Sequence, residues 1–202
     1  KAYRYLCIGL QLVDRRGPVS QVDLDRFLTK LQEFSDKVGA QADIPKTDQV
    51  IPRAARIDDF CADVDVQIGI NVVSVTGKIF NGTKIRALAE ASGCMLGDDG
   101  CFHRVDIATG KELFILYNLG EQLFTLSEIK NTQTHALGLI MDLPLVTDGL
   151  TVFNQMLLFA RQLAQTLGGK LVDTNEQPLT DPMVEKIRKQ VSLYQQRMKE
   201  EG

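Results

Sequence analysis

Residue types that build many active sites are scarce in this chain of 202 residues. It contains two histidines and four cysteines, and no two cysteines have the CxxC spacing of a zinc or redox site. No segment matches a P-loop, a GxSxG nucleophile elbow, an HExxH zinc motif, or a GxGxxG motif between a strand and a helix. The sequence therefore predicts no metal, no cofactor and no enzymatic activity.

The cysteines do not form the pattern of a disulfide framework either. They are Cys7, Cys61, Cys94 and Cys101. We expect free thiols, as in a reducing compartment, because disulfide-stabilised domains carry more closely spaced cysteines. A bridge between Cys94 and Cys101 stays open as an alternative.

The chain also lacks an excess of positive charge and a long apolar run. Lys and Arg number 23 against 26 Asp and Glu, which gives a net charge of −3, whereas a nucleic-acid-binding face concentrates basic charge. No apolar run approaches the ~20 residues of a membrane-spanning helix, and no signal peptide is present. We therefore expect no nucleic-acid partner. Because the chain begins with Lys1 rather than Met, we expect a fragment whose membrane anchor lies upstream.

The residues that are present favour a folded domain. Hydrophobic residues make up 44% and charged residues 24% of the chain, which is typical of globular proteins. Three apolar strand-like runs, residues 5–13, 66–75 and 137–144, are each followed by a loop and an amphipathic helix pattern. The third helix pattern, residues 150–167, is the strongest and ends at two glycines.

Each predicted helix is followed by a short extended segment, at residues 40–44, 101–107 and 170–172, and a hairpin strand at 112–119 follows the second. The sequence thus predicts an α+β fold: a largely antiparallel mixed sheet with helices packed on one face, built from repeated β-α-β units. We expect a single domain over residues 1–202. Its N-terminal extension, 1–65, holds one β-α-β unit and a short helix, and residues 66–199 form the rest.

The strand at 113–119 carries apolar residues on both faces. With Phe114 and Leu116 facing the helices, Leu113, Ile115, Tyr117 and Leu119 point to the open side of the sheet. The three unit-opening strands share an apolar-Gly-apolar pattern at Gly9, Gly69 and Gly138, and such glycines often mark the close approach of another backbone. Together these features predict a shallow apolar trough that binds a partner.

Other readings of the same residues stay open. The trough can be covered in cis by residues 45–65 or by the C-terminal helix that begins near Thr180, or the module can self-associate through the apolar strand of a second copy. Asp98, Asp99 and His103 could also form an acid–base site. A solvated turn followed by a hydrogen-bonded strand histidine explains them more simply, because acid–base catalysis needs burial and a positioned partner.

Several segments occur in the order and spacing of a known family. They are residues 97–104 (GDDGCFHR), residues 113–118 (LFILYN), a strand bounded by Pro144, and a helix ending in Leu-Gly-Gly that is followed by Leu171-Val172-Asp173. Together they resemble the C-terminal domain of the bacterial cell division protein ZipA, over roughly residues 66–198. No counterpart of the first 65 residues is recognised in the better-known members.

The resemblance implies a non-enzymatic adaptor of the divisome. Its sheet is antiparallel-rich and backed by helices, and its open face forms an apolar groove for the C-terminal peptide of FtsZ, the tubulin-like ring protein. The family's N-terminal membrane anchor and linker would place this domain at the cytoplasmic face of the bacterial inner membrane, where it tethers the division ring during septation.

Carried onto this sequence, the resemblance places the groove at Gln67, Gly69, Asp98, Asp99, Tyr117, Leu119, Gly138 and Ile140, and strand alternation adds Ile115. The apolar anchors are Tyr117, Leu119 and Ile140. The acidic pair Asp98 and Asp99 is expected to meet basic residues of the tail and to orient it. The family tends to place apolar side chains at four positions where this chain does not, so a less apolar groove is implied; they are Gln67, Gly69, Asp99 and Gly138.

Overall fold

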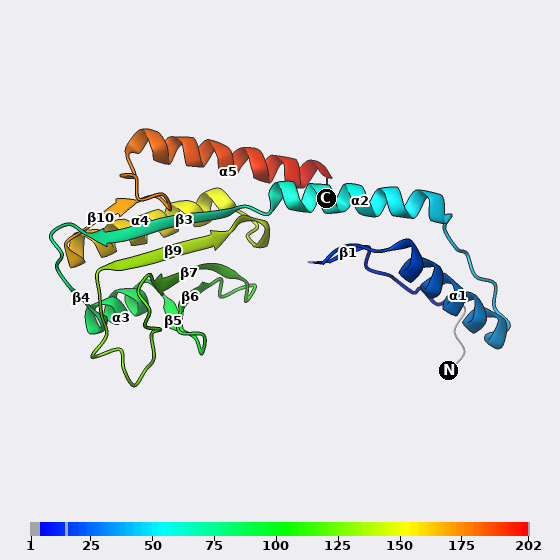
Figure 1. Cartoon of the computed structure of the whole chain (residues 1–202), viewed down its shortest axis with the longest axis horizontal. Helices are drawn as coiled ribbons and strands as arrows, with labels where there is room; N and C mark the ends of the chain where they lie inside the picture. Colours follow the sequence, from blue (N-terminus) through cyan, green and yellow to red (C-terminus); the bar gives the residue numbers. More distant parts are fainter. Residues whose placement is uncertain (1–4, 15, 202) are drawn as a thin grey trace. The chain divides into compact units, whose positions relative to one another are not determined.

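The computed structural model describes residues 5–14 and 16–201, and the chain divides into two compact units, residues 1–63 and 64–202. The larger unit holds the main sheet, and the smaller one holds a short hairpin and two helices (Figure 1). The single domain predicted over residues 1–202 stays a prediction.

The larger unit is built on a six-stranded sheet with the strand order β10-β3-β9-β7-β6-β5. Its strands are β3 (Gln67–Ser74), β5 (Cys94–Leu96), β6 (Phe102–Val105), β7 (Glu112–Asn118), β9 (Ala136–Asp142) and β10 (Gly169–Val172). Each of the five pairings in this sheet is antiparallel. A separate pair, β4 (Phe80–Asn81) with β8 (Gln133–Thr134), is also antiparallel. The predicted α+β fold is confirmed.

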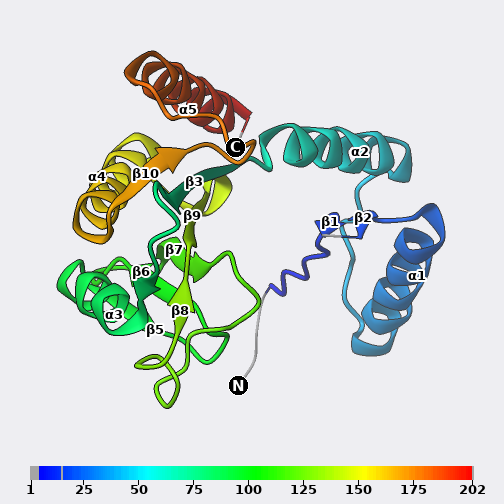
Figure 2. The same ribbon diagram turned by 60° about the vertical axis from the view of Figure 1, so that its left-hand side comes forward.

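Helices cover one face of this sheet (Figure 2). They are α3 (Gly82–Ala91), α4 (Gly149–Leu167) and α5 (Asp181–Glu201), with a short 3₁₀ turn, η1 (Leu143–Leu145). Helix α4 contacts β3, β9, β7 and β10, α3 contacts β5, and α5 packs on α4 and η1. The C-terminal helix therefore lies on the helical side, and no helix of the larger unit packs on the opposite face of the sheet.

Helix α4 forms where the sequence pattern predicts it. Asp148 caps its start, since the carboxylate accepts the amide N–H of Thr151 at 3.1 Å. Gly168 ends it with a left-handed φ of 75°, a conformation that costs glycine little. Ten of its residues are buried: Gly149, Val152, Phe153, Met156, Leu157, Phe159, Ala160, Leu163, Ala164 and Leu167.

Alternation along the central strands separates the core from the open face. Ile70 of β3 and Leu139 of β9 lie opposite each other, and both are fully buried beneath the helices. Their neighbours Gly69 and Ile140 point to the other face, where no helix of the larger unit packs. The core thus uses one face of the sheet, which leaves the second face available for another role.

The smaller unit contains the hairpin strands β1 (Val13–Asp14) and β2 (Gly17–Pro18), followed by α1 (Gln21–Val38) and α2 (Thr47–Val64). Ser20 caps α1 as the sequence indicates: its hydroxyl accepts the Asp23 amide and donates to the Asp23 carboxylate. Gly39 ends α1 with a φ of 64°. The predicted short helix within residues 45–65 is longer than expected, at 18 residues.

Two strand predictions in this unit are wrong for the single chain. Residues 5–12 form no strand, and residues 40–44 form none either. A strand needs a neighbour to accept its backbone hydrogen bonds, and neither segment has one among the described residues. Of the three predicted β-α-β units, the first therefore lacks its sheet.

The one-sided core can be tested with adjacent residues of β9. Leu139→Ala removes a fully buried side chain and should lower the free energy of unfolding by about 2–5 kcal/mol. The matched variant Ile140→Ala truncates the next residue, which faces the open side, and should cost much less. Urea denaturation of the full chain measures both. Equal losses would contradict a core confined to the helical face.

Candidate binding face of the sheet

The face of the main sheet opposite α4, here named the open face, presents an apolar row. Strand register places five residues side by side across five strands. In order, they are Met95 (β5), His103 (β6), Ile115 (β7), Ile140 (β9) and Gly69 (β3). Met95 is 66% exposed, and Ile115 and Ile140 are half-buried. The row thus offers apolar side chains that no helix of the larger unit covers.

The second row of the open face begins at Tyr117 and Gly138, which lie opposite each other. A Cβ atom placed on Gly138 would lie 2.4 Å from Cζ of the Tyr117 ring. The tyrosine ring therefore lies against the glycine backbone instead of standing free. The sequence pattern suggested that Gly138 admits the backbone of a partner, but in the structure it admits a side chain of the same chain.

Gly69 has a similar reason to be glycine. A Cβ atom at this position would lie 2.6 Å from Cγ2 of Thr174. Thr174 belongs to the turn after β10. The side-chain amide of Asn71 on β3 donates a hydrogen bond to the carbonyl of Asp173 in the same turn, at 3.5 Å. The β10–α5 loop therefore covers the Gly69 end of the row. This cover is a loop, and it is neither of the two segments that the sequence suggested.

The remaining apolar positions of the predicted groove lie at the strand ends. Leu119 follows β7 directly and is 42% exposed, and its amide donates to the carbonyl of Ala136. The prediction that Leu113 points to the open side is wrong. The register between β6 and β7 shifts at this residue, and its side chain packs against the buried core. A β-bulge redirects side chains in this way, so Leu113 does not extend the open face.

Polar residues border the row at both ends. Gln67 lies opposite Asp142 and donates its amide to that carboxylate at 2.5 Å. At the other end, the turn between β5 and β6 carries Asp98 and Asp99, which are both exposed. The predicted groove residues thus fall on one face or its rim. Their role in binding stays a prediction.

His103 places an ionisable ring in the apolar row. Its Nε2 lies 2.9 Å from a carboxylate oxygen of Asp99, and its Nδ1 contacts the carboxylate of Glu112. A carboxylate can only accept, so both ring nitrogens must carry protons to donate to both partners. The geometry therefore favours the imidazolium form, held between two carboxylates.

The pKa values of this cluster follow from the same contacts. Partial burial of His103 lowers its pKa, but hydrogen bonds to Asp99 and Glu112 outweigh burial and raise the pKa above its ordinary value. The pKa of Asp99 is lowered, chiefly by its hydrogen bond to His103. The negative charge of Asp99 is therefore partly committed within the chain, which leaves Asp98 as the less restrained member of the acidic pair.

The structure offers little to an enzymatic or metal site elsewhere. No group of three or more His, Cys, Asp or Glu side chains among the described residues is arranged to hold a metal ion. Cys94 and Cys101 are free thiols, so the alternative bridge is not formed. Burial raises the pKa of the Cys94 thiol to about 11, which makes it an unreactive core residue.

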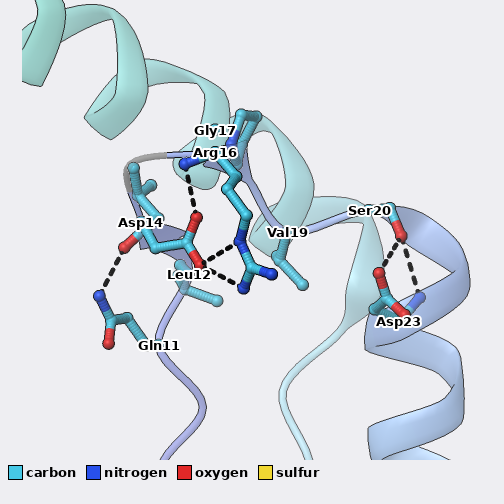
Figure 3. A pocket seen from close by; sticks show the side chains of 10 residues that line it. Gln11, Leu12, Asp14, Arg16, Gly17, Val19, Ser20 and Asp23 are labelled. Carbon is cyan, nitrogen blue, oxygen red and sulfur yellow. Dashed lines mark hydrogen bonds and ion pairs between the residues drawn. The ribbon is translucent and has the colours of Figure 1, made fainter.

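The smaller unit has a hollow of about 450 Å³ beside the β1–β2 hairpin (Figure 3). Its charged groups already satisfy one another: Arg16 donates to the Asp14 carboxylate at 2.8 Å, and Ser20 bonds to Asp23. Among the described residues, the charged side chains of this hollow are thus engaged with groups of the same chain. Within the part of the chain that is described, no helix is both long and apolar enough to cross a membrane.

Three residues of the open face escaped sequence reasoning. Met95 lies on a strand of only three residues, too short to show alternation. Asn71 and Thr174 come together only because the β10–α5 loop returns over β3, which no local pattern reveals. The sequence signal available for Met95 was Gly93, which ends the preceding helix and so marks where a new strand can begin. In the structure Gly93 has a positive φ, and β5 follows it directly.

Comparison with known proteins points to one family. Residues 66–190 match the family model of the C-terminal FtsZ-binding domain of ZipA. Three curated relatives, each called cell division protein ZipA, are from Marinobacter nauticus, Pseudomonas aeruginosa and Shewanella sediminis. They are 27%, 30% and 35% identical over 133, 139 and 107 residues, which is 64%, 67% and 52% of this chain. The aligned parts are 39%, 48% and 31% of the relatives, so the chain spans about half of their length or less.

The contact between Gly138 and Tyr117 can be tested by a double-mutant cycle. Gly138→Ala should displace the tyrosine ring and lower the free energy of unfolding by about 1–3 kcal/mol. Adding Tyr117→Ala removes the obstruction, so the double variant should be more stable than the sum of the two single losses predicts. Urea denaturation gives all four values. Strict additivity would mean that the ring does not lie against Gly138.

The His103 cluster predicts a pH dependence of stability. Because the folded-state pKa is raised, the contribution of His103 is full below its unfolded pKa, about 6.5, and is lost as the pH rises through the folded pKa. The difference in unfolding free energy between wild type and His103→Gln should therefore shrink from pH 6 to pH 9.

The matched control is His135→Gln, which removes the other histidine and leaves the two carboxylates untouched. Denaturant titrations at each pH measure both differences. If the difference in unfolding free energy between wild type and His103→Gln stays constant from pH 6 to pH 9, the two carboxylates do not stabilise the protonated form of His103.

Proposed function

Because the chain belongs to the ZipA family, whose model covers residues 66–190 of its 202 residues, we propose that its open face is the binding site for the C-terminal tail of FtsZ. The family domain is defined by FtsZ binding, and its members are non-enzymatic cell division proteins. The observation that carries the proposal is the apolar row with Met95, Ile115 and Ile140, which the helices of the larger unit leave uncovered.

The row favours a tail that lies across the strands. Its apolar members lie on β5, β7 and β9, and His103 of β6 lies between Met95 and Ile115. The loop that carries Thr174 covers the β3 end of the row. An amphipathic helix or an extended peptide placed there buries apolar side chains against Ile115 and Ile140, and burial contributes about 25 cal/mol per Å². Tyr117 and Leu119 flank this contact at the end of β7. The tail thus docks mainly over β5, β6, β7 and β9.

Charge at the β5–β6 turn supports an orientation. Asp98 and Asp99 are exposed beside the apolar row, and His103 already engages Asp99. A basic side chain of the tail meets Asp98 more readily than Asp99, because the Asp99 charge is shared with the imidazolium. Such a rim contact contributes orientation and association rate more than affinity.

In this proposal the chain is the ring-facing part of a longer adaptor. It holds FtsZ through the open face, while a segment upstream attaches the full-length protein to the inner membrane and places this domain at its cytoplasmic side. The family membership supports this arrangement, and the membrane attachment stays a prediction.

The binding face can be tested with a labelled peptide that matches the FtsZ tail of the same organism. Fluorescence anisotropy should show saturable binding to the full chain. Ile140→Asp places a charge in the centre of the row and should raise the dissociation constant at least about tenfold, the equivalent of 1.4 kcal/mol. The same loss is expected for Tyr117→Asp.

The matched control is Leu158→Asp, which changes an exposed leucine of α4 on the helical side. It should bind the peptide like wild type. Retained affinity in Ile140→Asp, or an equal loss in Leu158→Asp, would rule out the open face as the site.

A further inference from the structure

The smaller unit does not bury enough apolar surface to be complete. Among its described residues, only two apolar side chains are fully buried, Leu24 and Ala54. Tyr5 and Leu6 are 89% and 68% exposed, and Ile8 is 46% exposed. A unit of about 60 residues is already marginal with a normal core, so one with this little burial requires a further surface to pack against.

The backbone of residues 5–12 is equally incomplete. The segment is outside any strand, and its one backbone hydrogen bond among the described residues is the Val19 amide to the Leu12 carbonyl at 2.7 Å. Its side chains nevertheless alternate, with Leu6, Ile8, Leu10 and Leu12 on one side. The Asp14 carboxylate beyond its C-terminal end accepts hydrogen bonds from the backbone and the guanidinium of Arg16 (Figure 3). The pattern is that of a strand whose neighbours are absent.

The larger unit shows how the same chain completes such a strand. There β9, α4, β10 and α5 follow one another, and Gly168 ends α4 with positive φ. The smaller unit repeats this order with residues 5–13, α1, residues 40–44 and α2, and Gly39 ends α1 in the same way. In the larger unit β9 and β10 do not pair with each other, because β3 lies between them. Among its described residues, the smaller unit has no strand in the place of β3.

The strand that fills this place in the larger unit carries the same pattern. Ile68-Gly69-Ile70 of β3 pairs antiparallel with Leu137-Gly138-Leu139 of β9, with Ile70 opposite Leu139. Gly69 lies opposite Ile140, and Asn71 lies opposite Gly138, so an approximate twofold axis relates the two strands. Two strands of this pattern therefore complete each other. Residues Ile8-Gly9-Leu10 are the third example in the chain.

We propose that residues 5–13 of two copies of this chain pair antiparallel with each other and form the centre of a homodimeric sheet. Transferring the β3–β9 register places Leu10 opposite Leu10 of the second copy, Ile8 opposite Leu12, and Gly9 opposite Gln11. Residues 40–44 then become outer strands, as β10 is beside β3. The surface differs from the apolar strand 113–119 and does not depend on peptide binding.

The chemistry of the segment fits a self-complementary interface. Residues 5–13 contain no charged side chain, so pairing brings no like charges together within the strand. Leu10 occupies the place of Ile70 and Leu139, which are both fully buried against helices. The half-buried stripe of α1, with Phe27 and Leu31, supplies that cover. The strands and this stripe amount to about 20 residues a side, close to an interface of about 800 Å² per partner.

Sedimentation equilibrium of the full chain tests the association. We expect a concentration-dependent dimer of twice the 22.5 kDa chain mass. Leu10→Lys places two positive charges face to face at the axis and should make the chain monomeric at the same concentrations. The control Ile107→Asp changes an apolar residue of the larger unit that is 95% exposed, and its dimer should persist.

Chemical cross-linking tests the register without relying on a disruptive variant. In a chain with Cys7→Ser and Cys61→Ser, Leu10→Cys should cross-link to its own copy with a short bismaleimide. Leu12→Cys should do so much less alone, and should cross-link when mixed with Ile8→Cys. Labelled FtsZ tail should bind Leu10→Lys like wild type, which separates this proposal from the proposed function.

A monomer at all concentrations would overturn the proposal, as would a dimer that survives Leu10→Lys or dissociates equally in Ile107→Asp. A dimer in which Leu12→Cys alone cross-links as strongly as Leu10→Cys would overturn the register and with it the argument from β3 and β9.

Discussion

The pairing of β3 with β9 is the constraint on which the larger unit depends. Ile70 and Leu139 lie opposite each other and are fully buried, so a slip of one residue would turn the apolar set of either strand away from α4. The register is therefore fixed by the core. As a consequence, the residues between the core positions, including Gly69 and Ile140, face the open side.

What the open face presents then depends on how the chain fills it. Tyr117 lies against Gly138, and Thr174 lies against Gly69, so each glycine provides room for a neighbour that would otherwise project outward. His103 lies within the otherwise apolar row, and the carboxylates of Asp99 and Glu112 each contact one of its ring nitrogens. The apolar side chains of the row on this surface are Met95, Ile115 and Ile140. In the proposed function, a partner binds this surface through a few apolar side chains and is not enclosed in a deep pocket.

The sequence predicts best the features that depend on residues close together in the chain. Helix α4 and the caps at Ser20 and Gly39 depend on residues within one or two turns, and the sequence predicts them directly. The place of Ile115 on the open face follows from strand alternation, and that of Ile140 from the family resemblance. The prediction for Leu113 failed because a bulge shifts the register locally. The contact of Thr174 was missed because Thr174 lies 105 residues further along the chain than Gly69, which it contacts.

The failed strand at residues 5–12 is of a different kind, because the local pattern was as strong as that of β3. A strand is stabilised by hydrogen bonds to a neighbour, and local pattern cannot supply that neighbour. Within the larger unit two strands of the same pattern satisfy each other, and the result is a closed core. Among its described residues, the smaller unit holds one such strand and a half-buried helix stripe, so the rule that closes one unit leaves the other open. Self-pairing is then the solution that requires no new type of interaction, since the chain already contains the register in β3 and β9.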